Sequence, residues 1–137
     1  MSSKHLVLSI NDGLYAIAVS FVHKIAALPR ITRLPHTPPY ILGVANIDGN
    51  IYTIIDLRVK FGAPAGLSEP ETGILLSQEE NRICMIGDQI FSLIDICPED
   101  ILIPPQDDSY ISGVIQTDAS YIGILSVPNL LHTETDI

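Results

Sequence analysis

The four histidines are the side chains with the widest chemical repertoire in this sequence, because an imidazole can bind a metal ion or carry a proton near neutral pH. They are His5, His23, His36 and His132. The sequence has no His-x-x-x-His pair and no Cys/His spacing typical of a metal site. We therefore interpret each as a structural or solvated histidine, and we expect neither a metal site nor a cofactor.

Asp48 and Asp56 are the carboxylates that come nearest to an acid/base pair. They flank an apolar segment that reads as one strand, so we expect them at opposite ends of it and too far apart for joint catalysis. Asp56 precedes Leu57 and Arg58, where a carboxylate can cap a short turn. No serine has an evident His and Asp partner, and no phosphate-binding or dinucleotide motif occurs. The sequence therefore predicts no catalytic residues, and a surface for binding proteins rather than an enzyme.

The charge balance restricts the possible partners. Seven Lys and Arg face sixteen Asp and Glu, a net charge of -9, which argues against binding nucleic acid. Residues 1–62 hold six basic and three acidic residues, whereas residues 63–137 hold one and thirteen. An acidic surface that keeps an apolar domain soluble is one explanation. The other is that the two halves present different faces to different partners.

The cysteines and the apolar segments indicate the compartment. Cys84 and Cys97 form no Cys-x-x-Cys pair and read as small core residues in a reducing environment. Polar residues, Gly or Pro interrupt each apolar stretch before the roughly 18 residues of a membrane span. The first ten residues are too short an apolar run for a secretory signal. We therefore expect a cytoplasmic protein without direct membrane insertion.

The residues that would position any site are mostly in predicted strands. Ile and Val together number 29, against 8 Ala, which favours strands over helices. Asp12-Gly13 and Asp48-Gly49 are typical of tight hairpin turns. Four prolines make residues 29–39 a connecting loop. The predicted strands are residues 5–10, 14–18, 24–28, 41–46, 51–56, 73–78, 81–86, 92–96, 111–116 and 120–125.

The two halves of the chain resemble each other. Tyr40–Val44 recurs seventy residues later as Tyr110–Val114, and Leu6–Ser9 matches Ile74–Ser77 at an offset of 68. Two copies of about 65 residues, each five strands long, predict an all-β fold of two small barrels that share a hydrophobic joint. The expected division is a first subdomain at about residues 1–62, a crossover at 63–71 and a second subdomain at about 72–131.

Residues 31–62 contain the most specific pattern in the chain. An apolar-Gly-Val strand leads into a turn, and a second apolar strand ends in Asp-Leu-Arg. This pattern resembles the CheW family, the adaptors of bacterial chemosensory arrays, and a looser match extends the resemblance to about residues 5–131. The residues that carry it are Ile41, Gly43, Val44, Asn46, Gly49, Ile54, Ile55, Asp56, Leu57, Arg58 and Phe61.

The resemblance implies both a fold and a function. The fold is a single CheW-like domain made of two five-stranded Src-homology-3-like barrels with short helical turns. The function is that of a non-enzymatic adaptor, monomeric when free, that links a CheA-type histidine kinase to the cytoplasmic tip of methyl-accepting chemoreceptors. The alternative is a degenerate CheW-like module that binds another protein and no longer couples receptor to kinase. By similarity, the receptor-binding groove is lined by Val22, Lys24, Ile31, Asn46, Ile47 and Asp48.

Each groove residue also has a plain structural interpretation. Val22 and Ile31 can be core residues, Asn46 a turn residue and Lys24 a solvated strand residue. Asp48 departs from the family, which usually has Arg at this turn and often has Glu at the position of Lys24. If the two side chains are neighbours, the exchange keeps an ion pair and reverses the field that a partner meets. The alternative is that Asp48 only forms the turn.

Overall fold

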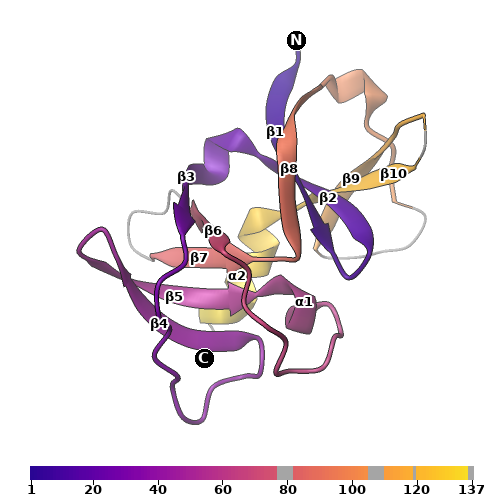
Figure 1. The fold of residues 1–137 in the computed structure, drawn as a ribbon. Coiled ribbons are helices and arrows are strands. Elements are labelled where there is room, and N and C mark those ends of the chain that lie inside the picture. Colours follow the sequence, from indigo (N-terminus) through magenta and orange to yellow (C-terminus); the bar gives the residue numbers. More distant parts are fainter. Residues whose placement is uncertain (77–81, 105–109, 119, 136–137) are drawn as a thin grey trace. The chain divides into compact units, whose positions relative to one another are not determined.

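The computed structural model describes residues 1–76, 82–104, 110–118 and 120–135 (Figure 1). Within these residues the chain forms ten strands, two α-helices and two 3-10 turns, so the prediction of an all-β fold with short helical turns is confirmed. The strands are β1 (Ser3–Ile10), β2 (Gly13–Ala18), β3 (Val22–Ala27), β4 (Ile41–Ile47), β5 (Asn50–Asp56), β6 (Thr72–Leu76), β7 (Ile83–Ile86), β8 (Gln89–Ile96), β9 (Ile111–Gln116) and β10 (Tyr121–Leu125). The helical elements are η1 (Val19–Phe21), α1 (Leu57–Lys60), η2 (Pro98–Asp100) and α2 (Val127–Thr135).

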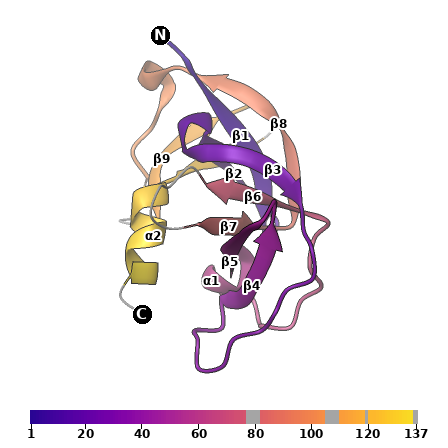
Figure 2. The same ribbon diagram turned by 90° about the vertical axis from the view of Figure 1, so that its left-hand side faces the viewer.

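The strands form two five-stranded sheets in two compact units. Unit 1 comprises residues 1–19 and 90–137, with the strand order β8-β1-β2-β10-β9. Unit 2 comprises residues 20–89, with the order β3-β6-β7-β5-β4. Figure 2 shows β8 beside β1, at the edge of the sheet of unit 1. Each sheet therefore combines a hairpin from one half of the chain with three strands from the other half.

This pairing corrects the predicted division of the chain at residues 63–71. That segment connects α1 to β6 inside unit 2, and the hairpin of β1 and β2 joins β8, β9 and β10. The repeat shows that the hairpins β1–β2 and β6–β7 are equivalent. Because their apolar patterns are alike, the pattern does not tell which hairpin joins which sheet. The choice depends on parallel pairs between segments far apart in the sequence, β2 with β10 and β5 with β7.

The repeat itself is present in the backbone hydrogen bonds. Thr32 and Val44 exchange two of them, at 2.8 and 2.9 Å, and Leu102 and Val114 exchange the equivalent two, at 2.7 and 2.9 Å. The offset between the two pairs is 70 residues, the offset found in the sequence. The order of the strands, the parallel pairing and these bridges agree between the units, so the internal repeat is confirmed. The two compact units, however, do not coincide with the two copies of the repeat.

A glycine precedes each bridged valine at the same place in both units. At Gly43, φ is +148° and a Cβ atom would lie 2.0 Å from the carbonyl oxygen of Thr32. At Gly113, a Cβ atom would lie 2.4 Å from a methyl carbon of Ile101. Gly43 thus lets two stretches of backbone approach closely, which no other residue permits at that conformation.

Apolar residues on alternating positions of the strands form a core in each unit. In β5, Tyr52 and Ile54 point inward while Ile51 and Thr53 are more exposed, which is the period-two pattern of a strand with one buried face. The cluster in unit 2 contains Leu42, Ala45, Ile47, Tyr52, Ile54, Leu75, Cys84 and Ile86. The cluster in unit 1 contains Ala16, Ile96, Ile115, Ile122 and Ile124.

Both predicted hairpin turns are present, but the first one lies one residue earlier in the sequence than predicted. Asp48 and Gly49 have φ values of +54° and +84°, as the two central residues of a tight hairpin require. In the first hairpin the positive φ values belong to Asn11 and Asp12, and Gly13 is already the first residue of β2. Asn tolerates the left-handed conformation nearly as well as Gly, which is why the turn begins one residue earlier than predicted.

Two further features bear on the compartment and on the cysteines. No helix in the described parts of the chain is long and apolar enough to cross a membrane. Cys84 is a buried core residue, as predicted, but Cys97 follows β8 and is partly exposed. Cys97 comes directly after the last residue of β8, where the alternation of buried and exposed side chains ends. Its apolar character alone therefore did not determine whether it is buried.

Candidate functional site

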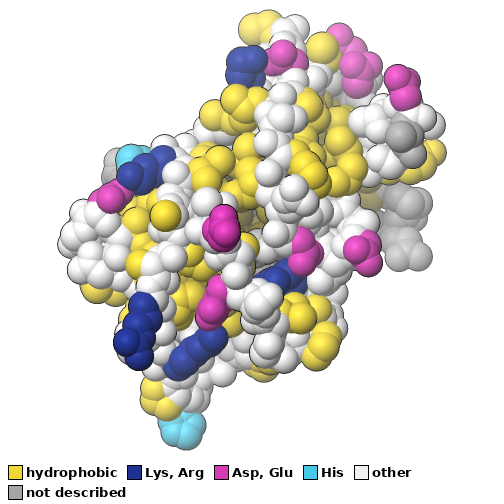
Figure 3. All heavy atoms as spheres, in the orientation of Figure 1, with side chains coloured by type: hydrophobic (Ala, Val, Ile, Leu, Met, Phe, Trp, Pro, Cys, Tyr) yellow, Lys and Arg dark blue, Asp and Glu magenta, His cyan; other side chains and the backbone are white. Residues whose placement is uncertain are grey.

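Two residues of the predicted groove, Lys24 and Asp48, lie on the exposed edge of unit 2. Lys24 lies on β3 and Asp48 at the tip of the hairpin between β4 and β5, and Lys24 Nζ forms an ion pair with the Asp48 carboxylate. The two side chains are 44% and 61% exposed. In the orientation of Figure 1, Figure 3 shows a basic and an acidic side chain in contact over this hairpin. The structure therefore brings the two charges together on the surface.

The same ion pair shows how far the sheet of unit 2 curls. β3 and β4 are the two outer strands of the sheet, with three strands between them. An ion pair from β3 to the hairpin that follows β4 requires the two edges to approach each other, as they do in a small barrel. The site is thus created by closure of the sheet, not by neighbouring residues in the sequence.

The hairpin tip is held by Asn46. Its side-chain oxygen accepts a hydrogen bond from the backbone N–H of Gly49, at 3.0 Å. Asn46 is exposed, and it lies opposite Ile51 in the register of β4 and β5. This bond explains Asn46 as a turn residue that orients Asp48 toward Lys24.

The apolar residues of the predicted groove take part in packing to different degrees. Ile47 is 5% exposed and belongs to the core cluster of unit 2. Ile31 is partly buried and packs against the same cluster. Val22 begins β3, is partly buried and pairs with Leu76, next to a bulge that precedes Lys24. Ile47 is therefore a core residue, and the polar members of the set, Lys24, Asn46 and Asp48, are the exposed ones.

Two exposed isoleucines beside the ion pair were not predicted. Ile25 follows Lys24 on β3 and is 44% exposed, and Ile51 lies opposite Asn46 and is 57% exposed. The alternation of β5 could have identified Ile51, because Tyr52 and Ile54 occupy the inward positions. Ile25 has no such signal, because it lies in an apolar run on an edge strand. Ile25 and Lys24 are consecutive residues of β3, so their side chains point to opposite sides of the strand.

The far end of β5 is fixed by a buried ion pair. Asp56 accepts hydrogen bonds from the Arg58 backbone N–H, Nε and Nη2, each at 3.0 Å, and it caps α1 as predicted. The Asp56 and Arg58 side chains are 1% and 7% exposed. The hydrogen bond to Asp56 and the charge of Asp56 raise the pKa of Arg58, so the guanidinium stays protonated at any pH at which the protein is folded. Asp48 and Asp56 flank β5 at opposite ends, as predicted.

Side chains that commonly bind metal ions are dispersed in the described parts of the chain. No group of three or more His, Cys, Asp or Glu side chains in the described ranges could hold a metal ion. His5 is buried, and its Nδ1 lies 3.1 Å from the Ser3 carbonyl oxygen, whereas the side chain of His132 lies outside the described parts. His5 is thus a satisfied structural histidine.

Comparison with known proteins gives a consistent result. A family model described as a CheW-like domain matches residues 4–135. The chemotaxis protein CheW of Helicobacter pylori is 31% identical over 127 residues, which are 89% of this chain and 77% of the relative. That of Bacillus subtilis is 27% identical over 138 residues, 96% of this chain and 88% of the relative. The crystal structure of the scaffolding protein TtCheW from Thermoanaerobacter tengcongensis matches with a TM-score of 0.82 and 30% identity, over 93% of this chain and 90% of that one. Since the family model covers nearly all of the chain and the crystal structure has the same fold, the chain belongs to the family of CheW-like proteins, which are non-enzymatic chemotaxis scaffolds.

Proposed function

We propose that this protein is an adaptor that couples chemoreceptors to a CheA-type histidine kinase in a chemotaxis-type pathway. The observation that carries the proposal is the match to the CheW-like domain over residues 4–135. The receptor-binding part includes the exposed polar residues Lys24, Asn46 and Asp48 of unit 2.

The ion pair of this surface acts in partner choice more than in folding. An exposed pair adds only about 0–1 kcal/mol to stability, because water and salt screen it. The same two charges act on a docked partner, where a like charge brought close is penalised and an opposite charge is favoured. A partner that complements Lys24 on β3 and Asp48 on the hairpin therefore prefers this protein over a relative with the two charges exchanged, by about 1–3 kcal/mol when several charges take part.

The experiment exchanges or removes these charges in the full chain. Asp48→Asn removes the charge and keeps the turn, because Asn tolerates the φ of +54° at this position. Lys24→Glu with Asp48→Arg restores an ion pair of reversed polarity. Each variant is titrated with the cytoplasmic fragment of a receptor from the same cell and with one that binds a CheW with Arg at the turn, at low and moderate salt. The matched control exchanges Lys4 and Asp95, an ion pair of similar exposure on unit 1.

We expect Asp48→Asn to weaken binding of the cognate receptor, with a larger effect at low salt, and the double exchange to shift preference toward the second receptor. The exchange of Lys4 and Asp95 leaves both affinities unchanged. If Asp48→Asn and the double exchange leave every affinity and its salt dependence unchanged, Asp48 is only a turn residue. Failure of the unmodified protein to bind any receptor or kinase would favour a degenerate interaction module instead.

A further inference from the structure

The chain passes between the two units twice. It leaves unit 1 after Val19, and it returns from unit 2 after Gln89. On the return, only Gly87 and Asp88 lie between the end of β7 and the start of β8. Residues at the ends of such elements are the usual hinges between linked parts of a protein. The groups that contact Asp88 therefore bear on the direction in which the chain leaves unit 2.

Arg58 connects this exit to the end of β5. Its Nε and Nη2 donate to the Asp56 carboxylate at 3.0 Å each, and its Nη1 lies 3.8 Å from the Asp88 carboxylate. β5 and β7 are parallel neighbours, and Asp56 lies opposite Ile86, two residues before Asp88. The hydrogen bond to Asp56 raises the pKa of Arg58 most, and the charge of Asp88 raises it further. One buried cation thus joins the end of β5 to the exit from unit 2.

The cation is itself fixed in place. The Arg58 side chain is 7% exposed, and the Arg58 backbone N–H donates to Asp56 at the start of α1. Leu57, between the two charged residues, is fully buried, and the Asp56 backbone N–H donates to the Tyr40 carbonyl oxygen at 2.7 Å. Because the guanidinium cannot follow Asp88, their attraction restrains Asp88 and not Arg58.

The other copy of the repeat has a proline at the position of Arg58. Asp56 and Ser126 each donate from the backbone N–H to the carbonyl oxygen of the tyrosine 16 residues earlier, at 2.7 Å in both cases. The two residues are therefore equivalent, at the offset of 70 that also relates the bridges. Arg58 and Pro128 each follow two residues later, so Pro128 of α2 is the counterpart of Arg58.

The other crossing has a serine at the position of Asp88. β7 pairs with β5 in the way that β2 pairs with β10, so Ala16 corresponds to Cys84. Four residues further along, Ser20 therefore corresponds to Asp88. Neither Pro128 nor Ser20 carries a charge, so of these two equivalent places only the exit from unit 2 can form an ion pair.

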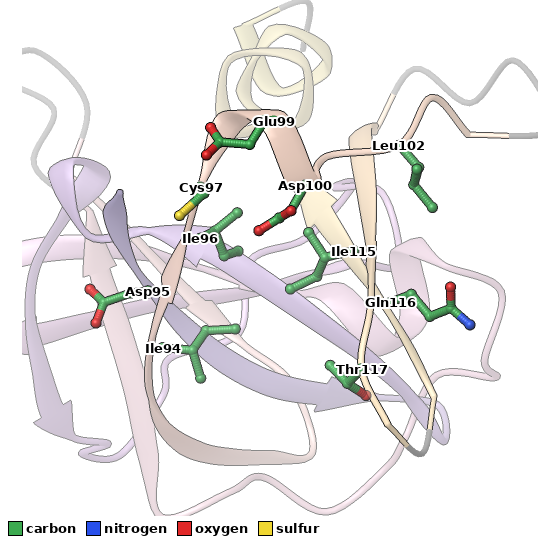
Figure 4. Close-up of a pocket in the computed structure, with 10 residues that line it drawn as sticks. All are labelled: Ile94, Asp95, Ile96, Cys97, Glu99, Asp100, Leu102, Ile115, Gln116 and Thr117. Atoms are coloured by element: carbon green, nitrogen blue, oxygen red, sulfur yellow. The ribbon is translucent and has the colours of Figure 1, made fainter. Parts of the chain in front are cut away.

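β8 connects Asp88 to the interior of unit 1. Its eight residues span roughly 26 Å, at about 3.3 Å per residue. Near its end, Ile94 and Ile96 point toward Ile115 of β9, whereas Asp95 points to the other side of the strand and forms an ion pair with β1 (Figure 4). The far end of β8 is thus anchored in unit 1, so a change of direction at its start alters the orientation of that unit.

We propose that the Arg58–Asp88 ion pair is a conformational restraint, which holds the start of β8 against unit 2 and which the loss of the Asp88 charge releases, so that the two units reorient relative to each other. It acts on geometry more than on stability, because a carboxylate that is 43% exposed at 3.8 Å adds little to folding. Relative motion is the ordinary expectation for linked units that no such contact holds. The restraint is separate from the Lys24–Asp48 ion pair, which involves the hairpin before β5.

The test measures the orientation of the units in solution, in the full, isotope-labelled chain. Residual dipolar couplings of backbone amides in a neutral polyacrylamide gel give one alignment tensor for unit 1 and one for unit 2. The variants are Asp88→Asn, which removes the charge at constant size, Asp88→Lys, which reverses it, and Asp88→Glu, which keeps it. The matched control is Asp95→Asn, because Asp95 is 58% exposed and belongs to an ion pair within unit 1, near the other end of β8.

We expect the couplings of the unmodified chain, of Asp88→Glu and of Asp95→Asn to fit one tensor for both units. In Asp88→Asn the two tensors should differ in magnitude by at least about a fifth, and in Asp88→Lys by more, because a like charge then faces the guanidinium. A urea titration checks that each variant is as fully folded as the unmodified chain. One common tensor in Asp88→Asn and Asp88→Lys, or two different tensors in the unmodified chain, would overturn the proposal. An equal change in Asp95→Asn would assign the effect to the loss of any surface charge, and would also overturn it.

Discussion

Replacing Asp56 by Asn tests how the buried ion pair supports unit 2. The Asn oxygen can keep the hydrogen bond that caps α1, a contribution of about 1 kcal/mol. Its amide group, however, faces the donor Arg58 Nη2 where a carboxylate oxygen accepted at 3.0 Å. The guanidinium, 7% exposed, loses its counter-charge. Breaking a buried pair in this way costs about 3–5 kcal/mol.

A neighbouring carboxylate moderates this loss. Asp88 lies 3.8 Å from Arg58 Nη1 and is 43% exposed, so it offers a partial, screened replacement. We therefore expect Asp56→Asn to lower the free energy of unfolding by about 3 kcal/mol, a large part of the 5–15 kcal/mol typical of a domain. Asp88→Asn serves as the control and should lower it by at most about 1 kcal/mol.

Urea unfolding followed by circular dichroism measures both variants, and Arg58→Met completes a double-mutant cycle. We expect the loss in Asp56→Asn/Arg58→Met to be smaller than the sum of the two single losses, because removing both charges leaves neither one unpaired. A loss below about 1 kcal/mol in Asp56→Asn, or an equal loss in Asp88→Asn, would refute the reasoning that the buried pair holds this end of β5.

Three further predictions follow from the backbone, the cysteines and the units. Gly43→Ala should lower the free energy of unfolding by about 3 kcal/mol because of its backbone clash, whereas Gly62→Ala, which has open space at a φ of +111°, should lower it by about 1 kcal/mol in urea titrations. Iodoacetamide at pH 8 should modify Cys97 and leave Cys84 intact in mass spectra, because burial raises the pKa of Cys84 to about 12; equal modification would contradict its burial. A fragment of residues 20–89 contains all five strands of unit 2 and should give a β-type circular dichroism spectrum with cooperative unfolding, which an unstructured fragment would contradict.

The sequence predicted the strands, the repeat and the hairpin that carries Asp48, because all three depend on local patterns. A run of β-branched and apolar residues identified β5, and Asp-Gly identified its turn. The sequence could not predict which hairpin joins which sheet, because β1–β2 and β6–β7 have equivalent apolar patterns. That choice depends on parallel pairing between Thr53 and Ile83, 30 residues apart, and between Leu14 and Ile122, 108 residues apart, for which neither strand carries a local signal.

The candidate sites were predictable to different degrees for a similar reason. Lys24 and Asp48 could be named from a family resemblance, but their contact depends on the curvature that brings the two edges of the sheet together. Ile47 was placed in the groove by the same resemblance, and the period of two along β4 turns its side chain into the core instead.

A comparison of the two copies in a common register shows where they differ. Ala45 lies opposite Tyr52 in unit 2, and Ile115 lies opposite Ile122 at the equivalent place in unit 1. All four side chains are buried in the cores of their units, so each copy fills this place with a different pair of side chains. At the hairpin that follows β4, Ile47 is buried, whereas its counterpart Thr117 after β9 is exposed. The two copies have thus kept one pattern of backbone pairing and diverged in the side chains that it positions, which is why the repeat predicts the strands but not the surface of each unit.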